Sequence, residues 1–265
     1  MGMPSPTIGL IANPVSARDI RRIVANASNL SIADRVNIVL RLLASAGACG
    51  VERVLMMPDR GGIRALLERS LKRERNLHHA FPEIEFLDME PCSTVQDTLE
   101  AARLLREAGV AAIVVLGGDG THRAVVAQCR EIPIAGLSTG TNNAFPEMRE
   151  PTLTGMAVGL YASGRIGAAE ALASNKLIEV RVEDGSRERR DIALVDAVVS
   201  TERCIGARAL WKTESLVAAY LSFAEPLAIG FSAIGGLLQP VGRHAPGGLA
   251  ILLAAPGGAA RVQLH

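Results

Sequence analysis

Apolar residues in the first 150 positions form short runs that alternate with segments of helical spacing. Runs typical of buried strands cover residues 7–12, 51–58, 84–89, 110–117 and 132–138. Between them, apolar residues recur every three or four positions, which predicts helices over 18–28, 33–48, 61–75, 95–109 and 121–129. Strands and helices in this rhythm favour a parallel sheet covered on both faces. We therefore expect an α/β domain over residues 1–150.

The pattern changes after Pro151. Residues 152–164 predict a helix that bridges two domains, and 177–200 predict two strands around a charged turn at Asp184 and Gly185, an antiparallel hairpin. The segments 227–242 and 248–258 favour further short strands. We therefore expect a mainly β domain over residues 151–265. If its last strands are incomplete, an uncovered edge would need a partner subunit.

Composition excludes several classes of function. The formal net charge is +1 and aromatic residues make up 3% of the chain, which argues against nucleic-acid binding. The longest apolar runs are broken by glycine and proline, so no membrane span or membrane surface is expected. No signal peptide is recognisable at the N-terminus. Four cysteines without CxxC spacing favour buried thiols in a reducing cytoplasm: Cys49, Cys92, Cys129 and Cys204.

The stretch 114–126, VVLGGDGTHRAVV, joins a buried strand to a helix through glycines. Backbone N–H groups at such a helix N-terminus form an anion site, and glycines let a phosphate approach and permit positive φ. Asp119 would repel phosphate unless Mg²⁺ or a substrate hydroxyl lies between them. Gly117, Gly118 and Gly120 therefore indicate polyphosphate, and Asp119 indicates metal binding or proton transfer. The alternative is a tight turn in which Asp119 only caps the helix.

Two further polar loops follow predicted strands. The loop 136–145, GLSTGTNNAF, carries four side chains that can bond to phosphate or ribose: Thr139, Thr141, Asn142 and Asn143. The loop 13–16, NPVS, is by itself equally typical of an Asn-Pro turn. Because ligands bind outside the carboxyl ends of parallel strands, three such loops together predict one crevice.

These motifs resemble the ATP-NAD kinase superfamily, which includes diacylglycerol and sphingosine kinases, and most closely its acetoin catabolism protein X subgroup. The segments that carry the resemblance span most of the chain: 8–22, 54–64, 114–125, 138–146 and 230–236. The resemblance implies an NAD kinase/diacylglycerol kinase-like α/β N-terminal domain, a β-rich C-terminal domain and a site between them. It also implies ATP and Mg²⁺, phosphoryl transfer to a hydroxyl acceptor such as NAD, and a homo-oligomer.

The resemblance assigns roles to individual residues. Asp119 matches the aspartate that lies near the acceptor hydroxyl as base or Mg²⁺ ligand, and Gly117, Gly118 and Gly120 match glycines along the phosphates. Asn13 matches the asparagine of the Asn-Pro-x-Ser loop. The remaining nucleotide-binding candidates follow these motifs: Thr121, Thr139, Gly140, Thr141 and Asn142. Asn143 and Asp196 are the substrate-binding candidates.

The chain departs from NAD kinases on the acceptor side. Val195 stands where their asparagine precedes the acid matched by Asp196. The segment 232–236, SAIGG, lacks the tyrosine of their dinucleotide segment and, apart from Ser232, its hydroxyls. Ala17 also replaces a glycine. The first two changes place NAD as the acceptor in question, since a site selects a substrate's polar groups only when it offers hydrogen-bond partners for them. Asp196 is explained equally well by pairing with an arginine of 187–190.

Other interpretations stay open at this point. The chain is either a kinase or a non-catalytic nucleotide sensor or accessory protein of acetoin catabolism, while a lipid kinase would need a basic or amphipathic surface. His122 either touches phosphate or packs against a neighbouring element. Arg208 and Lys212 either reach an anionic acceptor or are surface charges.

Overall fold

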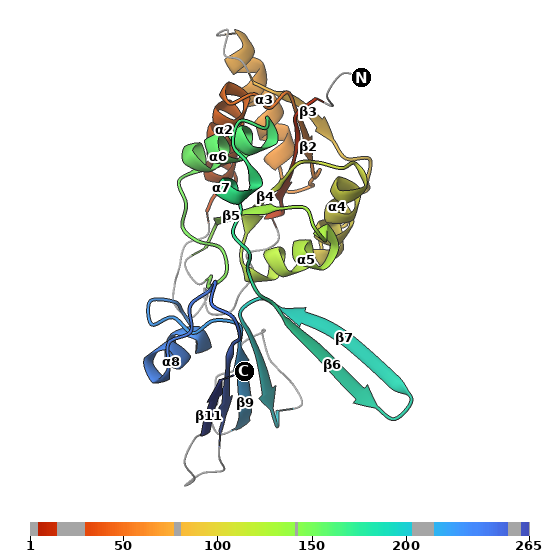
Figure 1. Cartoon of the computed structure of the whole chain (residues 1–265). Helices are drawn as coiled ribbons and strands as arrows, with labels where there is room; N and C mark the ends of the chain where they lie inside the picture. The colour runs from red at the N-terminus through yellow and green to blue at the C-terminus, as the bar shows by residue number, and fades with distance from the viewer. Residues whose placement is uncertain are drawn as a thin grey trace. The chain divides into compact units, whose positions relative to one another are not determined.

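The computed structural model describes residues 5–14, 30–76, 81–140, 143–202 and 215–253, and the backbone of 261–264. These residues form two compact units, of which the first extends to Leu172 and the second holds 143–145 and the residues from Ala173 onward. Figure 1 labels their helices and strands.

The first unit is built on a five-stranded parallel sheet with the order β3-β2-β1-β4-β5. The strands are β1 (Thr7–Ala12), β2 (Arg53–Met56), β3 (Glu83–Phe86), β4 (Ile113–Gly117) and β5 (Ile134–Ser138). All five predicted strands are confirmed, because buried apolar runs bounded by polar turns leave few other arrangements.

Six helices of the described part of the first unit connect the strands of this sheet or follow its last strand, β5. They are α2 (Ile32–Ala48), α3 (Ile63–Asn76), α4 (Val95–Glu107), α5 (Asp119–Cys129), α6 (Pro151–Ala162) and the short α7 (Ala168–Ala171). The capping residues are those expected from helix chemistry: the Ser31 side chain accepts a hydrogen bond from Asp34 N, and Thr94 accepts one from Gln96 N. The helix predicted over 18–28 lies outside the described residues.

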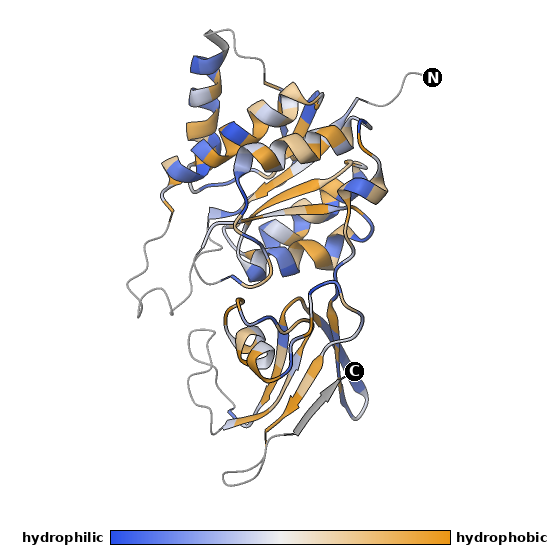
Figure 2. Ribbon diagram, turned by 60° about the vertical axis from the view of Figure 1, so that its left-hand side comes forward, coloured by the Kyte–Doolittle hydropathy of each residue, from blue (hydrophilic) through white to orange (hydrophobic). Residues whose placement is uncertain are grey.

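Alternate residues of each strand face opposite layers of helices, which Figure 2 shows as apolar strands between two helical layers. Ile8 and Leu10 pack into a core with α2, α3 and α6. Ile11 faces the other side and packs with α4 and α5. Each such fully buried side chain stabilises the fold by about 1.5–3 kcal/mol. The predicted two-faced sheet is thereby confirmed.

Helix α6 packs closely against α2 through its glycines. A Cβ at Gly155 would overlap Ser45 and the Leu42 carbonyl, and one at Gly159 would lie 2.8 Å from Ala46 O. This packing makes α6 part of the first unit, which ends at Leu172 rather than at the expected boundary of 150.

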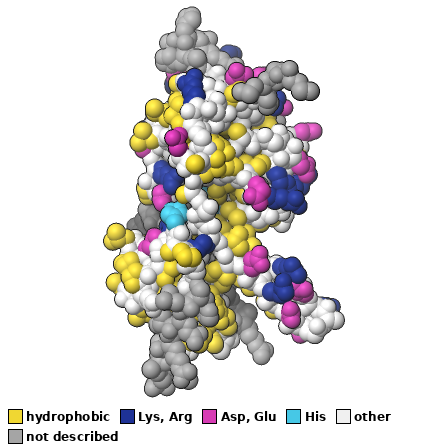
Figure 3. All heavy atoms as spheres, viewed as in Figure 1, with side chains coloured by type: hydrophobic (Ala, Val, Ile, Leu, Met, Phe, Trp, Pro, Cys, Tyr) yellow, Lys and Arg dark blue, Asp and Glu magenta, His cyan; other side chains and the backbone are white. Residues whose placement is uncertain are grey.

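The second unit contains two separate sheets. The larger is antiparallel with the order β11-β10-β9-β8, formed by β8 (Asp196–Ser200), β9 (Leu216–Leu221), β10 (Leu249–Leu252) and β11 (Arg261–Leu264). The smaller is a hairpin of β6 (Ile178–Asp184) and β7 (Arg187–Ala193). Figure 3 shows basic and acidic side chains interspersed along this hairpin.

Two expectations for this unit need correction. The hairpin is confirmed, with Gly185 at φ 59° in its turn, but it ends at Ala193, and Asp196–Ser200 pairs with β9 in the other sheet. The segment 227–242 contains helix α8 (Phe231–Leu238) where short strands were expected. Short apolar runs do not distinguish the two by periodicity. Gly235 and Gly236 allow α8 to approach Leu221 and Pro226 closely.

Candidate functional site

The order of the sheet brings the three predicted loops together. Strand β1 lies beside β4, and β4 beside β5, with Ala12 opposite Leu116 and Gly117 opposite Ser138. The residues that follow these strands therefore emerge side by side at one edge. The chain also reverses its direction of winding between β1 and β4, which is where open α/β sheets bind ligands. The carboxyl ends of the three strands therefore lie side by side. That the loops after them form one crevice stays a prediction.

Helix α5 begins at this edge with Asp119 as its first residue. Its N-cap is Gly118, with φ −97° and ψ −172°, and a glycine has no side chain with which to cap the helix. The N-terminal partial positive charge of α5 therefore lies at the carboxyl end of β4 without a side-chain cap from Gly118. Asp119 is half-buried at N1, so the interpretation of Asp119 as the N-cap is wrong.

The glycines of the motif serve different purposes. A Cβ at Gly117 would lie 2.6 Å from the Cβ and Oγ1 of Thr121, so Gly117 is needed where β4 meets α5. A Cβ at Gly120 would have no atom within 4 Å, which leaves open space beside the backbone. The backbone at Gly118 is extended, so close approach rather than positive φ explains these glycines, contrary to part of our expectation.

His122 is fully buried in the first turns of α5. Its Nδ1 lies 2.9 Å from Gly118 O, and a Cβ at Gly136 of β5 would lie 2.6 Å from its Nε2. Burial lowers the pKa of His122, outweighing the Gly118 carbonyl and the charge of Asp119, which act in the opposite direction. His122 therefore packs as a neutral ring between α5 and β5, the second of the two interpretations raised by the sequence.

Asn13 braces the start of α4. Its side chain is 3% exposed, and its Nδ2 donates to Thr98 Oγ1 at 3.0 Å and to Thr94 O at 3.2 Å. Arg35 Nη1 donates to Asn13 O at 3.2 Å. The observed contacts thus hold the β1 loop in place, and direct contact of Asn13 with a nucleotide stays a prediction.

Asp97 organises the loop that precedes α4. Its carboxylate accepts hydrogen bonds from Cys92 N at 2.8 Å and Ser93 N at 2.7 Å. Burial raises its pKa, but hydrogen bonds from Cys92, Ser93 and Thr94 outweigh burial and hold the pKa below its ordinary value. The Thr-x-x-Asp spacing of 94–97 is a capping-box signature that could have revealed this acid.

Arg35, like Asp97 and Thr98, was not singled out from the sequence. Arg35 is 4% exposed although it is charged. It lies next to Val36 on the buried face of α2. A charged residue among the apolar positions of a helix could have indicated a buried, partnered arginine from the sequence alone.

The loop after β5 is described in part. Thr139 is 4% exposed, and Ser138 Oγ donates to Gly140 O at 2.9 Å. Asn143 is half-buried. Thr141 and Asn142 lie outside the described residues, as do Arg208 and Lys212.

The acceptor-side candidates lie in the second unit. Asp196 is half-buried at the start of β8, opposite Leu221 of β9. Val195 is 8% exposed, and its carbonyl accepts from Ser222 N at 2.9 Å. Ser232 lies in the first turn of α8, fully buried, with its hydroxyl donating to Phe223 O at 2.9 Å. Val195 therefore offers no polar side chain, and the Ser232 hydroxyl is bonded to the backbone.

The described residues contain no group of three or more histidine, cysteine or acidic side chains suited to hold a metal by themselves. A magnesium ion bound by one or two carboxylates usually completes its shell with water and substrate phosphates. A single carboxylate, Asp119, in the first turn of a helix fits that mode of binding.

Comparison with known proteins divides the chain in the same way as the structure. The family model of the ATP-NAD kinase N-terminal domain matches residues 8–166, and that of the acetoin catabolism protein X C-terminal domain matches 176–264. The acetoin catabolism protein X of Cupriavidus necator is 65% identical over 254 residues, covering 96% of this chain and 71% of that protein.

A solved structure described as a diacylglycerol kinase of Bacillus anthracis strain Sterne is also similar. It is 12% identical, with a TM-score of 0.36, and the match covers 100% of this chain and 93% of that one.

Proposed function

The chain belongs to the ATP-NAD kinase superfamily, in the group of acetoin catabolism protein X, and from this premise we propose that it transfers the γ-phosphoryl group of ATP to a hydroxyl acceptor. The observation that carries the proposal is the Gly-Gly-Asp-Gly turn at the switch point of the sheet. There, the N-terminus of α5, the open space beside Gly120 and the carboxylate of Asp119 occur together.

Phosphate binding follows from the backbone of this turn. Amide groups at the start of α5 and the partial positive charge of its N-terminus would stabilise the polyphosphate. The absence of a Cβ at Gly120 lets a phosphate approach the helix, because no described atom beyond the glycine's own helix lies within 4 Å of the position that a Cβ would take. Catalysis would then depend mainly on positioning and on charge neutralisation.

Asp119 would hold Mg²⁺ or act on the acceptor. When bound, Mg²⁺ would neutralise charge on the β- and γ-phosphates. Asp119 would otherwise orient the acceptor hydroxyl and accept its proton. Either role requires a carboxylate at the first turn of α5, where Asp119 lies half-buried.

The proposed acceptor is NAD or another small hydroxyl compound, with NAD the first to be tested. Val195 is apolar and buried, and the Ser232 hydroxyl donates a hydrogen bond to Phe223 O. These two features weaken the case for NAD, because the polar groups of a dinucleotide would find no side-chain partners at these two positions.

The same two features favour a second candidate function, a nucleotide sensor or accessory protein of acetoin catabolism without turnover. A lipid kinase is the less supported alternative, because the sequence shows no obvious basic or amphipathic surface for a membrane. No described helix has the length and apolar character needed to cross a bilayer. Sedimentation with anionic vesicles tests that alternative directly.

A homo-oligomer and a cytoplasmic location stay predictions, which light scattering and cell fractionation can check.

The test is NADP formation by purified protein with ATP, Mg²⁺ and NAD, compared with the Asp119→Asn variant. Asp88→Asn is a matched control, since Asp88 is an exposed acid in the loop after β3 at the same edge of the sheet. NADP made by wild type and by Asp88→Asn, but not by Asp119→Asn, supports an NAD kinase. ATP binding without NADP excludes NAD and directs the search to another acceptor or to the sensor.

A further inference from the structure

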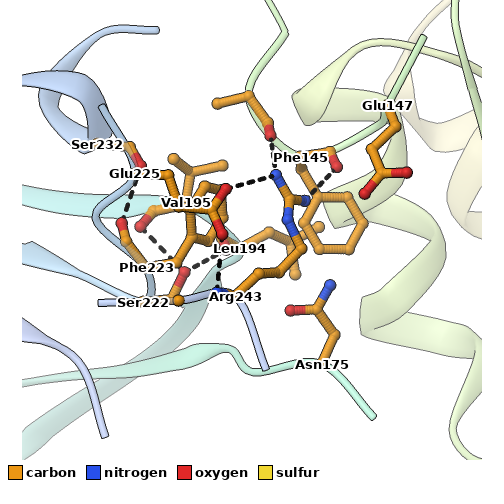
Figure 4. Close-up of polar contacts among 12 residues, drawn as sticks. Phe145, Glu147, Asn175, Leu194, Val195, Ser222, Phe223, Glu225, Ser232 and Arg243 are labelled. Atoms are coloured by element: carbon orange, nitrogen blue, oxygen red, sulfur yellow. Dashed lines mark hydrogen bonds and ion pairs between the residues drawn. The ribbon is translucent and has the colours of Figure 1, made fainter. Parts of the chain in front are cut away.

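Arg243 is a largely buried arginine in the segment between the β9–α8 region and β10. Its side chain is 12% exposed. Neither the sequence motifs nor the roles implied by the family resemblance include it. Figure 4 shows its guanidinium group pointing at the backbone of the segment that follows β5.

The guanidinium group of Arg243 binds two successive carbonyl groups. Nη1 donates to Phe145 O at 2.6 Å, and Nη2 donates to Ala144 O at 2.9 Å. Both carbonyls belong to the polar loop 139–145, and residues 143–145 are part of the second unit together with Arg243. Carbonyl groups of an irregular loop need partners, and here one side chain supplies two bonds.

Arg243 is itself held firmly. Its guanidinium carbon lies 4.2 Å from the ring centroid of Phe223, a cation–π stack on a fully buried ring. Glu225 Oε1 accepts from the Arg243 backbone N at 2.9 Å, and Glu225 Oε2 lies 3.8 Å from Nη2. The side chain therefore has one orientation, fixed from behind by the ring and from the side by the acid.

The residues behind Arg243 are also fixed. Ser232 of α8 donates to Phe223 O, and Ala224 and Val241 form a two-bond bridge, each at 2.8 Å. The Phe223 ring that stacks on Arg243 is thus supported by hydrogen bonds that join neighbouring segments of the second unit. A rigid support of this kind is what a loop-positioning side chain requires.

We propose that Arg243 is a positioning residue for nucleotide binding, which fixes the backbone that directly follows Asn143 by holding Ala144 O and Phe145 O. This inference rests on the proposed function, and it takes Asn143, whose amide can bond to phosphate or ribose, as a contact of the bound nucleotide. Because Asn143 directly precedes the two held residues, its backbone has little freedom while Arg243 is in place. Arginine suits the role because its planar fork presents two donors at once, whereas lysine offers a single point of charge.

The test compares Arg243→Ala and Arg243→Lys with wild type in two independent measurements. Hydrogen exchange of peptides covering 139–146, without nucleotide, reports on the loop alone. Titration calorimetry with Mg²⁺ and the non-hydrolysable analogue AMP-PNP reports on binding. Arg64→Ala is the matched control, because Arg64 also stacks on a phenylalanine, Phe86, at 4.3 Å and pairs with Glu68 without contacting this loop.

We expect Arg243→Ala to speed exchange in 139–146 by about tenfold or more and to weaken AMP-PNP binding at least tenfold, the scale of losing charge-assisted hydrogen bonds. Arg243→Lys should restore part of both effects, and Arg64→Ala should change neither. If Arg243→Ala does not fold, the same comparison between Arg243→Lys and wild type decides the question.

Unchanged exchange in the Arg243 variants would overturn the inference. Faster exchange with unaltered AMP-PNP affinity would also overturn it, because the loop would then be held for stability alone. If wild type itself binds no AMP-PNP, the proposed function fails and the nucleotide role of Arg243 fails with it. The exchange measurement would still show whether Arg243 holds the loop, so the two failures are distinguishable.

Discussion

Two glycines three positions apart in one motif should respond in opposite ways to the same substitution. In Gly117→Ala, the new Cβ would lie 2.6 Å from Thr121 Cβ and Oγ1 and 2.8 Å from Thr121 Cγ2. Favourable contacts between carbon atoms lie at about 3.5–4.0 Å, so one element must move by nearly an ångström. Thr121 is 5% exposed and has little room to retreat.

The magnitude for Gly117→Ala follows from two opposing effects. Overpacking of a tight contact costs about 1–3 kcal/mol, and the lower entropy of the unfolded chain returns about 0.4–1 kcal/mol. The net expectation is a loss of about 1–2 kcal/mol in the free energy of unfolding. For a chain of this size, that corresponds to a fall in Tm of roughly 2–8 °C.

Gly120→Ala should behave differently. Its Cβ would meet nothing within 4 Å, and alanine is favoured over glycine in a helix by up to about 1 kcal/mol. Stability should therefore be unchanged or slightly higher. The methyl group would occupy the space through which we propose that a phosphate approaches, so AMP-PNP affinity should fall by about tenfold or more.

Thermal unfolding followed by circular dichroism and titration calorimetry with AMP-PNP separate these effects. Gly167→Ala is the control, since a Cβ there also meets nothing within 4 Å but lies at the start of α7, outside the predicted motifs. The reasoning is refuted if Gly117→Ala is as stable as wild type, or if Gly120→Ala binds AMP-PNP as tightly as Gly167→Ala does.

Two further predictions concern the supports of the site. The pKa of His122 is lowered in the folded protein, so the unfolded chain binds the proton first and stability falls as pH drops below about 6.5. Urea unfolding at pH 7.5, 6.5 and 5.5 should show a decrease in the free energy of unfolding of wild type that approaches 1.4 kcal/mol per pH unit below about pH 6.5. This decrease should be absent in His122→Gln, and equal pH dependence in both proteins would contradict the prediction. Asn13→Ala should lower the free energy of unfolding by about 1–3 kcal/mol, because it leaves the buried Thr98 hydroxyl and Thr94 carbonyl without this donor. Chemical denaturation of Asn13→Ala, Thr98→Val and the double variant measures this loss. Additive effects would show that Asn13 and Thr98 are not coupled.

The parallel sheet and its loops were predictable because their signals are local. Strand β4 is a run of five buried residues, and the glycines after it mark the start of α5. The rhythm of strands and helices then places the loops after β1, β4 and β5 on a common edge. Only the order of the strands, which the sequence does not state, was needed to make them neighbours.

What was missed depends on contacts between distant residues. Helix α8 appeared as strands because its glycines pack against Leu221 and Pro226, a tertiary requirement without a periodic signal. The domain boundary was misplaced because Gly155 and Gly159 bind α6 to α2. Arg243 acts on carbonyls 98 and 99 positions earlier in the chain, and no pattern within its own segment indicates this.

The most direct test of the account is transfer of the γ-phosphoryl label of radioactive ATP. Wild type, Asp119→Asn and Asp88→Asn are incubated with Mg²⁺ and either NAD, acetoin or another small hydroxyl compound, and labelled product is separated from phosphate. We expect a labelled product with at least one acceptor, formed equally by Asp88→Asn and about a hundredfold or more slower by Asp119→Asn. Full activity of Asp119→Asn would contradict the role of that carboxylate. Tight ATP binding with no labelled product from any acceptor would contradict catalysis and leave the nucleotide sensor as the function.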